Sequence, residues 1–345
     1  MEQKLSTQSD NLFVPIKPFQ KDGRNVLNPA VVSDHAEIAL MLSDGNNLLA
    51  WNISNPKYHP YFSYGSTFKD SHLYVEKPYN ERGLMHPMLR RKIDSQLKTI
   101  TNNFVDQKFP IQVIIEGFES FYNCLERRLT GLSYQIIRDK PEDKNTLYNI
   151  SGIIVDTSVY HVLHEQIMQI EYDATEDNNK KKTTFYPCVE LKNISTGNHL
   201  IIIAAHVNGC SSQFPEEGLH SLRTLMESLG QSFGYEDIIA IGDFNSPPDY
   251  VAKVFDGKFK IVTTNYLTHC NPNSQACKYD MAVVLPGSKQ TNGHNYEMLP
   301  VEYVSINSQN LVNSIGEAQS AILQEKKLIR MDHEELLEIL YGEKK

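Results

Sequence analysis

Polar side chains with catalytic potential follow several apolar runs of the chain. The most informative run is IIAIGDFNSPP, in which apolar residues lead into Gly242 and then into Asp243 and Asn245. Residues two apart in an extended strand point to the same face, so we expect this carboxylate and this amide to lie side by side, with Phe244 pointing into packing. Such a pair suits a water molecule that must be oriented and deprotonated next to a metal ion.

Other apolar runs have polar residues where they begin or end, namely Asn52, Glu116, His206 with Asn208, and Asp280. The carboxyl end of a strand faces a crevice, where acidic and amide side chains rarely serve packing. A glutamate directly after a buried strand must be paired, protonated or bound to metal, because an isolated buried charge is costly. Each residue alone also has a structural explanation, such as a hydrogen bond at a strand end, so the set carries more information than its members.

These side chains need a scaffold of strands and helices to bring them together. Short apolar runs rich in β-branched residues predict buried strands over residues 47–53, 111–115, 152–155, 199–205, 237–241 and 280–285. Apolar residues three or four apart predict helices over residues 88–105, 118–129 and 219–229. Strands that alternate with helices indicate an α/β protein.

Composition limits the classes of function. The chain has 345 residues, of which 33 are Lys or Arg and 42 are Asp or Glu, for a net charge of −9. This balance argues against a protein that coats polyanions through bulk positive charge, but not against an enzyme that meets one phosphate beside a metal ion. No apolar run approaches the roughly 20 residues of a membrane helix, and the N-terminus lacks the apolar core of a secretory signal. We expect a soluble, cytoplasmic monomer.

The five cysteines are few and odd in number, which predicts reduced thiols. Cys270 and Cys277, with His269 beside them, resemble half of a zinc site. Because the second half of such a pattern is missing, we expect an ordinary loop at this position.

The order Asn52, Glu116, His206, Asp243-Phe244-Asn245 and Asp280 resembles that of the endonuclease/exonuclease/phosphatase superfamily, the group similar to deoxyribonuclease I. The GDFN tetrapeptide after an apolar strand is the most specific mark of this resemblance, which covers about residues 45–340. It implies a four-layer α/β sandwich, with two mixed β-sheets packed face to face and helices outside, and a phosphoesterase that depends on Mg²⁺ or Mn²⁺.

The resemblance also implies roles for individual residues. Asn52 and Glu116 would hold or orient the metal ion. Asp243 would position or deprotonate the attacking water, and Asn245 would hold the water and the phosphate.

Further roles concern the phosphate and the transition state. His206 would hydrogen-bond the scissile phosphate, with Asn208 assisting. Family members normally end with an Asp-His pair just before the last strand, and downstream of Asp280 such a pair occurs at Asp332-His333. His333 would then stabilise the transition state, with Asp280 orienting it and Asp332 near the metal.

The chain departs from the family pattern at several points. Ile115 replaces the Gln that usually precedes the metal-binding Glu, and Asn52 and Glu116 are far apart for the family. His333 lacks the usual following Pro and lies in a helical pattern, so His294 is the alternative, although no Asp precedes it.

The domain organisation follows from the extent of the resemblance. Residues 46–345 are expected to form the catalytic domain. Residues 1–45 are expected to form an N-terminal extension whose apolar stretch, residues 36–42, docks on that domain. Residues 54–87 form an aromatic-rich insertion that could stack on bases or cap a lipid headgroup, although a loop packed by its own aromatics is commoner. Residues 173–183 predict a solvated hairpin tip.

The substrate class is the least determined property. The segment GDFNSPPDYVAKVF resembles exo-deadenylases and related phosphodiesterases, which favours a nucleic-acid or nucleotide phosphodiester. A phosphoinositide phosphatase, a sphingomyelinase-like phospholipase and a non-catalytic binding protein that retains the fold stay open. The C-terminal segment DHEELLEILYGEKK resembles the Glu-rich tails of bacterial type IV secreted effectors, which would imply export, and it equally resembles the charged end of an ordinary helix.

Overall fold

The structure is a computed structural model that describes residues 20–21, 24–25, 33–54, 87–106, 108–139, 149–173, 181–207, 215–233, 237–269, 277–287, 296–300 and 303. Several sequence predictions fall outside these residues. They concern most of the aromatic insertion, the charged hairpin tip, the C-terminal segment, and the residues Asn208, Cys270, His294, Asp332 and His333.

One six-stranded sheet has the strand order β12-β13-β11-β10-β9-β8. Its strands are β8 (Tyr160–Asp173), β9 (Lys181–Asn193), β10 (His199–His206), β11 (Asp237–Asp243), β12 (Lys260–Thr263) and β13 (Asp280–Leu285). Strands β10 and β11 are parallel, and the other neighbours are antiparallel.

The second six-stranded sheet has the order β14-β3-β4-β5-β7-β6. Its strands are β3 (Ile38–Met41), β4 (Asn47–Asn52), β5 (Ile111–Gly117), β6 (Tyr134–Arg138), β7 (Ile150–Asp156) and β14 (Glu297–Met298). Strands β4 and β5 are parallel, and β3, from the segment expected to be an N-terminal extension, pairs with β4 inside this sheet. A separate short pair joins β1 (Gln20–Lys21) and β2 (Arg24–Asn25).

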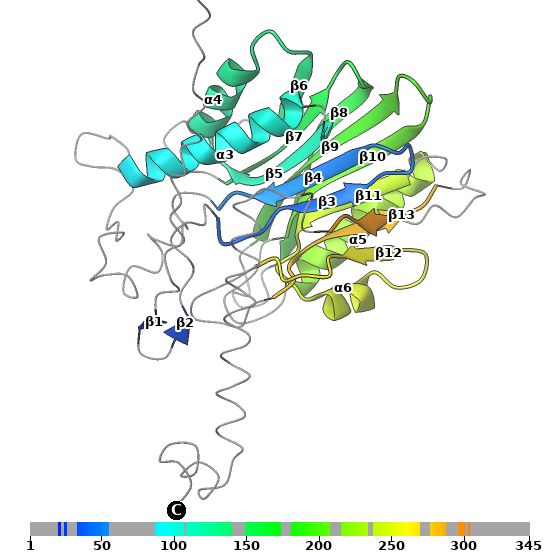
Figure 1. Cartoon of the computed structure of the whole chain (residues 1–345). Helices are drawn as coiled ribbons and strands as arrows, with labels where there is room; N and C mark the ends of the chain where they lie inside the picture. Colours follow the sequence, from blue (N-terminus) through cyan, green and yellow to red (C-terminus); the bar gives the residue numbers. More distant parts are fainter. Residues whose placement is uncertain are drawn as a thin grey trace, which may run out of the picture.

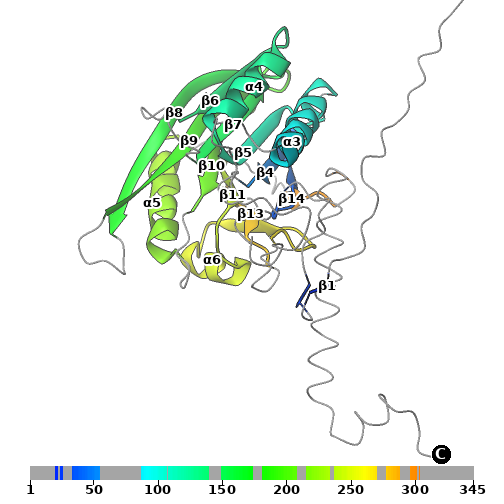
Figure 2. The same cartoon turned by 90° about the vertical axis from the view of Figure 1, so that its left-hand side faces the viewer.

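The helices are α3 (Pro87–Val105), α4 (Glu119–Leu129), α5 (Glu216–Ser232) and α6 (Pro248–Val254). Helices α3 and α4 cover the outer face of the second sheet, and α5 and α6 cover the outer face of the first (Figures 1 and 2). The six predicted strands and three predicted helices are confirmed. None of the described helices is long and apolar enough to span a membrane.

Alternation along the strands builds the layers. In β10, Leu200 and Ile202 point into the core shared by the two sheets, whereas Ile201 and Ile203 join the cluster that includes residues of α5. A strand with apolar residues on both faces must be covered on both, which is why the sheets lie in the middle of the molecule. The predicted four-layer sandwich is confirmed.

The GDFN segment owes its glycine to a close approach of two strands. Gly242 has a φ of +141°, and a Cβ atom at this position would lie 2.3 Å from the carbonyl oxygen of Ala205 on β10. A side chain would therefore push β11 away from β10 where the two strands carry the polar residues of the site.

Gly242→Ala should lower the free energy of unfolding by about 3 kcal/mol, because backbone strain and a backbone clash coincide there. Gly197→Ala is the control, since Gly197 also has a positive φ of +72° but no atom within 4 Å of an added Cβ. The control should cost only about 1 kcal/mol. Urea unfolding of both variants checks the difference, and equal losses would contradict it.

Candidate active site

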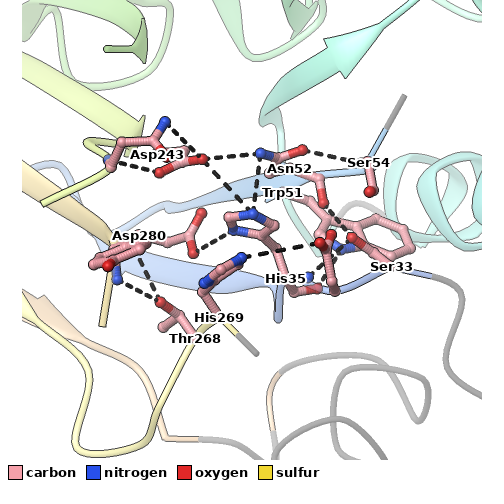
Figure 3. Close-up of polar contacts among 12 residues, drawn as sticks. Ser33, His35, Trp51, Asn52, Ser54, Asp243, Thr268, His269 and Asp280 are labelled. Carbon is pink, nitrogen blue, oxygen red and sulfur yellow. Dashed lines mark hydrogen bonds and ion pairs between the residues drawn. The ribbon is translucent and has the colours of Figure 1, made fainter. Parts of the chain in front are cut away.

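Four buried polar residues from both sheets meet at one end of the sandwich (Figure 3). His35 Nδ1 lies 2.8 Å from Asp280 Oδ2, and Asn52 Nδ2 donates a 3.0 Å hydrogen bond to Asp243 Oδ2. His35 Nε2 lies 3.7 Å from the same Asp243 oxygen and 3.4 Å from Asn52 Nδ2. The cluster therefore joins an imidazole between two carboxylates with an amide that holds one of them.

The backbone of His35 is fixed against β4. The Ser33 hydroxyl donates to the carbonyl oxygen of Asn52 at 2.6 Å and accepts from the His35 backbone N–H at 3.1 Å. The indole N–H of Trp51 donates to the His35 carbonyl oxygen at 3.1 Å. These contacts fix the position of the histidine before the chain enters β3.

The two aspartates are placed by strand register. Asp243 at the end of β11 is the partner of Asp280 at the start of β13. The Thr268 hydroxyl oxygen accepts hydrogen bonds from the backbone N–H groups of Asp280 and Tyr279, at 3.0 and 3.1 Å. The backbone of Asp280 is thus held in place from both its strand and a neighbouring loop.

Asn245 lies beside Asp243, as predicted, but through a turn and not through strand alternation. Strand β11 ends at Asp243, and Asn245 adopts a left-handed conformation with a φ of +48°. Its backbone N–H donates to Asp243 Oδ1 at 2.8 Å, and its side-chain amide donates to the carbonyl oxygen of Val207 at 2.9 Å. Both oxygens of Asp243 are therefore hydrogen-bonded, one by Asn245 and one by Asn52. Phe244 is buried in the apolar cluster that includes residues of α5 and α6, as predicted.

Glu116 and His206 form a second polar pair at the same end. Glu116 Oε1 lies 3.4 Å from His206 Nε2, and both side chains are more than four-fifths buried. His206 is also the register partner of Asp243 across the parallel strands β10 and β11. The structure thus brings together six of the residues predicted from the sequence: Asn52, Glu116, His206, Asp243, Asn245 and Asp280.

The charges of these groups depend on one another. Burial alone would lower the pKa of His35, but the carboxylates of Asp280 and Asp243 outweigh it and raise this pKa well above its usual value. Burial raises the pKa of both aspartates, against the opposing effect of His35. Burial lowers the pKa of His206. At neutral pH the site therefore holds a charged His35 and a neutral His206.

Sequence analysis missed His35, because it lies in the segment expected to be an extension. The sequence did contain a signal, since Asp34-His35 is an Asp-His pair directly before the apolar run that forms β3. In the structure Asp280, which was expected to orient His333, is hydrogen-bonded to His35. The roles expected for Asp332 and His333 stay predictions, because both residues lie outside the part of the chain that the structure describes.

A second missed histidine packs against the first. The ring of His269 lies 4.4 Å from that of His35 and is stacked on Tyr279 at 5.1 Å. Its Nε2 lies 3.9 Å from Asp34 Oδ2, and burial lowers its pKa well below the usual value. The resemblance of this segment to half of a zinc site was set aside in favour of an ordinary loop, and the structure pairs the backbones of His269 and Cys277 there.

Two groups of described side chains have ligand atoms close enough to hold a cation, namely Asp34 with His35 and His269, and His35 with Asp243 and Asp280. In addition, the Oδ1 atom of Asp34 is buried without a hydrogen-bond partner. An unpartnered carboxylate oxygen of this kind is compatible with a hard divalent cation, which prefers oxygen ligands. The amide oxygen of Asn52 accepts a 2.9 Å hydrogen bond from the Ser54 backbone N–H and has a second lone pair, so its expected role in holding or orienting the metal ion stays a prediction.

Asp280→Asn should lower the pKa of His35, because it removes the nearer negative charge while burial remains. NMR titration of the His35 imidazole in metal-free buffer checks this. Asp237→Asn, at the far end of β11, is the control and should leave the pKa of His35 unchanged. An unchanged value in Asp280→Asn would contradict the charge balance described here.

No protein-family model matches the sequence, and no curated protein is significantly similar to it in sequence. Solved structures similar to the chain include an endonuclease/exonuclease/phosphatase from Bacteroides vulgatus, at 14% identity and a TM-score of 0.44, covering 56% of this chain and 79% of that one. A mannosyl-6-phosphatase from Bacteroides thetaiotaomicron VPI-5482 is 16% identical, with a TM-score of 0.45, over 56% of this chain and 78% of that one. TDP2 from D. rerio, complexed with a single-strand DNA product, is 14% identical, with a TM-score of 0.45, and the match covers 57% of this chain and 78% of that one. The similar structures thus include members of the family that the sequence resembles.

Proposed function

We propose that this chain is a metal-dependent phosphoesterase whose favoured substrate is a phosphodiester of nucleic acid or nucleotide. The observation that carries the proposal is the arrangement around Asp243. Its carboxylate is held on both oxygens by Asn52 and Asn245 and faces His35, which is oriented by Asp280. A fixed carboxylate beside an imidazole with its own carboxylate partner is a constellation suited to hydrolysis by water.

Asp243 would accept the proton of the attacking water. Its hydrogen bonds leave the side chain little freedom, so the carboxylate stays aimed at one position. Burial raises the pKa of Asp243, which makes its carboxylate a stronger base than that of an exposed aspartate. Attack would then proceed in line, without a covalent intermediate.

His35 and His206 would bind the phosphate oxygens. The protonated His35 would stabilise the charge that develops on these oxygens in the transition state, because its own charge is already held by Asp280 and needs no rearrangement. The neutral His206 would donate a hydrogen bond. We assign to His35 the role that the resemblance gave to His333, and to Asp34 the role that it gave to Asp332.

Oxygen donors near this end of the sandwich fit a divalent cation such as Mg²⁺ or Mn²⁺. Glu116 would hold the cation, and Asn52 would help to hold it or orient the neighbouring groups. The unpartnered Oδ1 of Asp34 is a further oxygen donor, in the group that Asp34 forms with His35 and His269. When bound, the cation would polarise a phosphoryl oxygen and neutralise developing charge. Asp243 would accept the proton of the water, and His35 and His206 would bind the phosphate oxygens.

Hydrolysis should depend on both the cation and Asp243. We would measure turnover with Mg²⁺ or Mn²⁺ on bis-p-nitrophenyl phosphate, single-stranded RNA and DNA, sphingomyelin and phosphoinositides. Asp243→Asn should lose at least ~10²-fold in turnover, the usual cost of one acid–base group. Asp237→Asn is a matched control, because Asp237 is also buried on β11 but lies at the other end of the strand.

Activity on lipids alone would move the substrate to the phospholipase or phosphoinositide class, and absence of activity on every substrate would favour a binding protein.

His35→Ala should lose at least ~10²-fold in turnover, because a buried donor to the transition state is removed. His333→Ala should retain turnover within a few-fold of wild type. Steady-state rates on the best substrate of the panel distinguish the two histidines. A large loss in His333→Ala, with His35→Ala close to wild type, would restore the assignment that the resemblance implied.

A further inference from the structure

Strand β5 carries an extra residue at the position of Glu116. Ile114 pairs with Gly152 of β7, but the next pair joins Gly117 to Ile150, so two residues of β5 face one residue of β7. This is a β-bulge, which leaves a residue unpaired and re-aims its side chain. Glu116 lies in the bulge with a φ of +59°, a conformation that is strained for a residue with a side chain. The surrounding structure must therefore hold it there.

The phenol of Tyr122 fills the space behind this bulge. Helix α4 begins two residues after Gly117, and its first turn folds Tyr122 back against the strand, fully buried. A Cβ atom on Gly117 or on Gly152 would lie 2.6 Å from atoms of this side chain. The two glycines thus form a slot across β5 and β7 that fits the ring.

The hydroxyl group of Tyr122 reaches the backbone on both sides of the bulge. It lies 3.2 Å from the carbonyl oxygen of Ile150 on β7 and 3.5 Å from that of Ile114 on β5. Burial raises the pKa of Tyr122, so the hydroxyl keeps its proton and remains a donor. The hydroxyl has one proton, which it donates to the nearer oxygen, that of Ile150, and it lies between the last regular pair before the bulge and the first pair after it.

Arg138 at the end of β6 packs over the face of the Tyr122 ring. Its guanidinium lies 5.0 Å from the centre of the Tyr122 ring and is fixed by two hydrogen bonds, of 2.6 and 3.2 Å, to the Glu119 carboxylate. Arg138 is also the register partner of Gly152. The tyrosine is thus enclosed by helix α4, two glycines and a guanidinium.

We propose that Tyr122 is a positioning residue for Glu116, which fixes the bulge so that the Glu116 carboxylate points into the site. This inference rests on the proposed function, in which Glu116 holds the cation. Tyr122 does not contact the reacting atoms, so its effect should be on cation binding before it is on the chemical step. Removing a group that orients a metal-ligating side chain typically weakens metal binding about 10- to 100-fold.

The test is Mn²⁺ binding to the full chain, measured by electron paramagnetic resonance of free Mn²⁺ without any substrate. Tyr122→Phe should weaken Mn²⁺ binding about 10-fold or more. Tyr134→Phe is the matched control, because the Tyr134 hydroxyl donates a 3.2 Å hydrogen bond to the Glu126 carbonyl oxygen of the same helix, and Tyr134 pairs with Asp156 at the end of β7 away from the bulge. Its Mn²⁺ affinity should equal that of wild type, which separates positioning from loss of a tyrosine hydroxyl that is hydrogen-bonded to the backbone.

Glu116→Gln distinguishes the failure of the two proposals. If Glu116→Gln leaves Mn²⁺ affinity unchanged, the proposed role of Glu116 is wrong. If Glu116→Gln weakens binding but Tyr122→Phe does not, or weakens it no more than Tyr134→Phe, the role of Tyr122 is wrong. In the double variant Tyr122→Phe/Glu116→Gln, the tyrosine substitution should have no additional effect, because the carboxylate that it positions is gone.

Discussion

The 2.8 Å hydrogen bond between His35 Nδ1 and Asp280 Oδ2 joins the two sheets in the interior of the sandwich. His35 immediately precedes β3 of one sheet, and Asp280 begins β13 of the other. Both side chains are buried, so removing one partner of such a pair would cost roughly 3–5 kcal/mol. The same contact decides the charge of the site, because it keeps His35 protonated beside Asp243. Stability and proposed chemistry therefore depend on one interaction.

This interaction also explains the position of the N-terminal part of the chain. In the family that the sequence resembles, the Asp-His pair precedes the last strand, whereas here Asp34-His35 precedes β3, the first strand of the two large sheets. Strand β3 pairs with β4, which ends in Asn52, so the histidine and the amide come from neighbouring strands. The polar residues of the site therefore come from both sheets and from the segment before β3.

Much of the fold and part of the site could be predicted from the sequence. Apolar periodicity predicted α3, α4 and α5 and six of the strands, because burial on two faces leaves a clear pattern. Polar side chains at the ends of apolar runs predicted the site residues, among them Asp243 and Asp280. Periodicity could not predict the partner of Asp280, because His35 lies 245 residues away in the chain.

Local backbone conformation was also beyond the sequence patterns. Glu116, Asn245 and Ser54 all have positive φ values, although none is a glycine. Tertiary contacts impose these conformations, such as the hydrogen bonds of Asn245 to Asp243 and Val207 and the enclosure of Tyr122 behind Glu116. The glycines that permit the bulge, Gly117 and Gly152, gave no signal because they are far apart in sequence.

In the proposed reaction, water activated by Asp243 beside the charged His35 attacks phosphorus. The most direct measurement is hydrolysis of bis-p-nitrophenyl phosphate in ¹⁸O-labelled water with Mn²⁺, followed by mass spectrometry of both products. The account predicts that the label enters p-nitrophenyl phosphate and is absent from p-nitrophenol, with turnover that requires the cation. Label in the phenol would contradict attack at phosphorus, and turnover that persists without a divalent cation would contradict the proposed site.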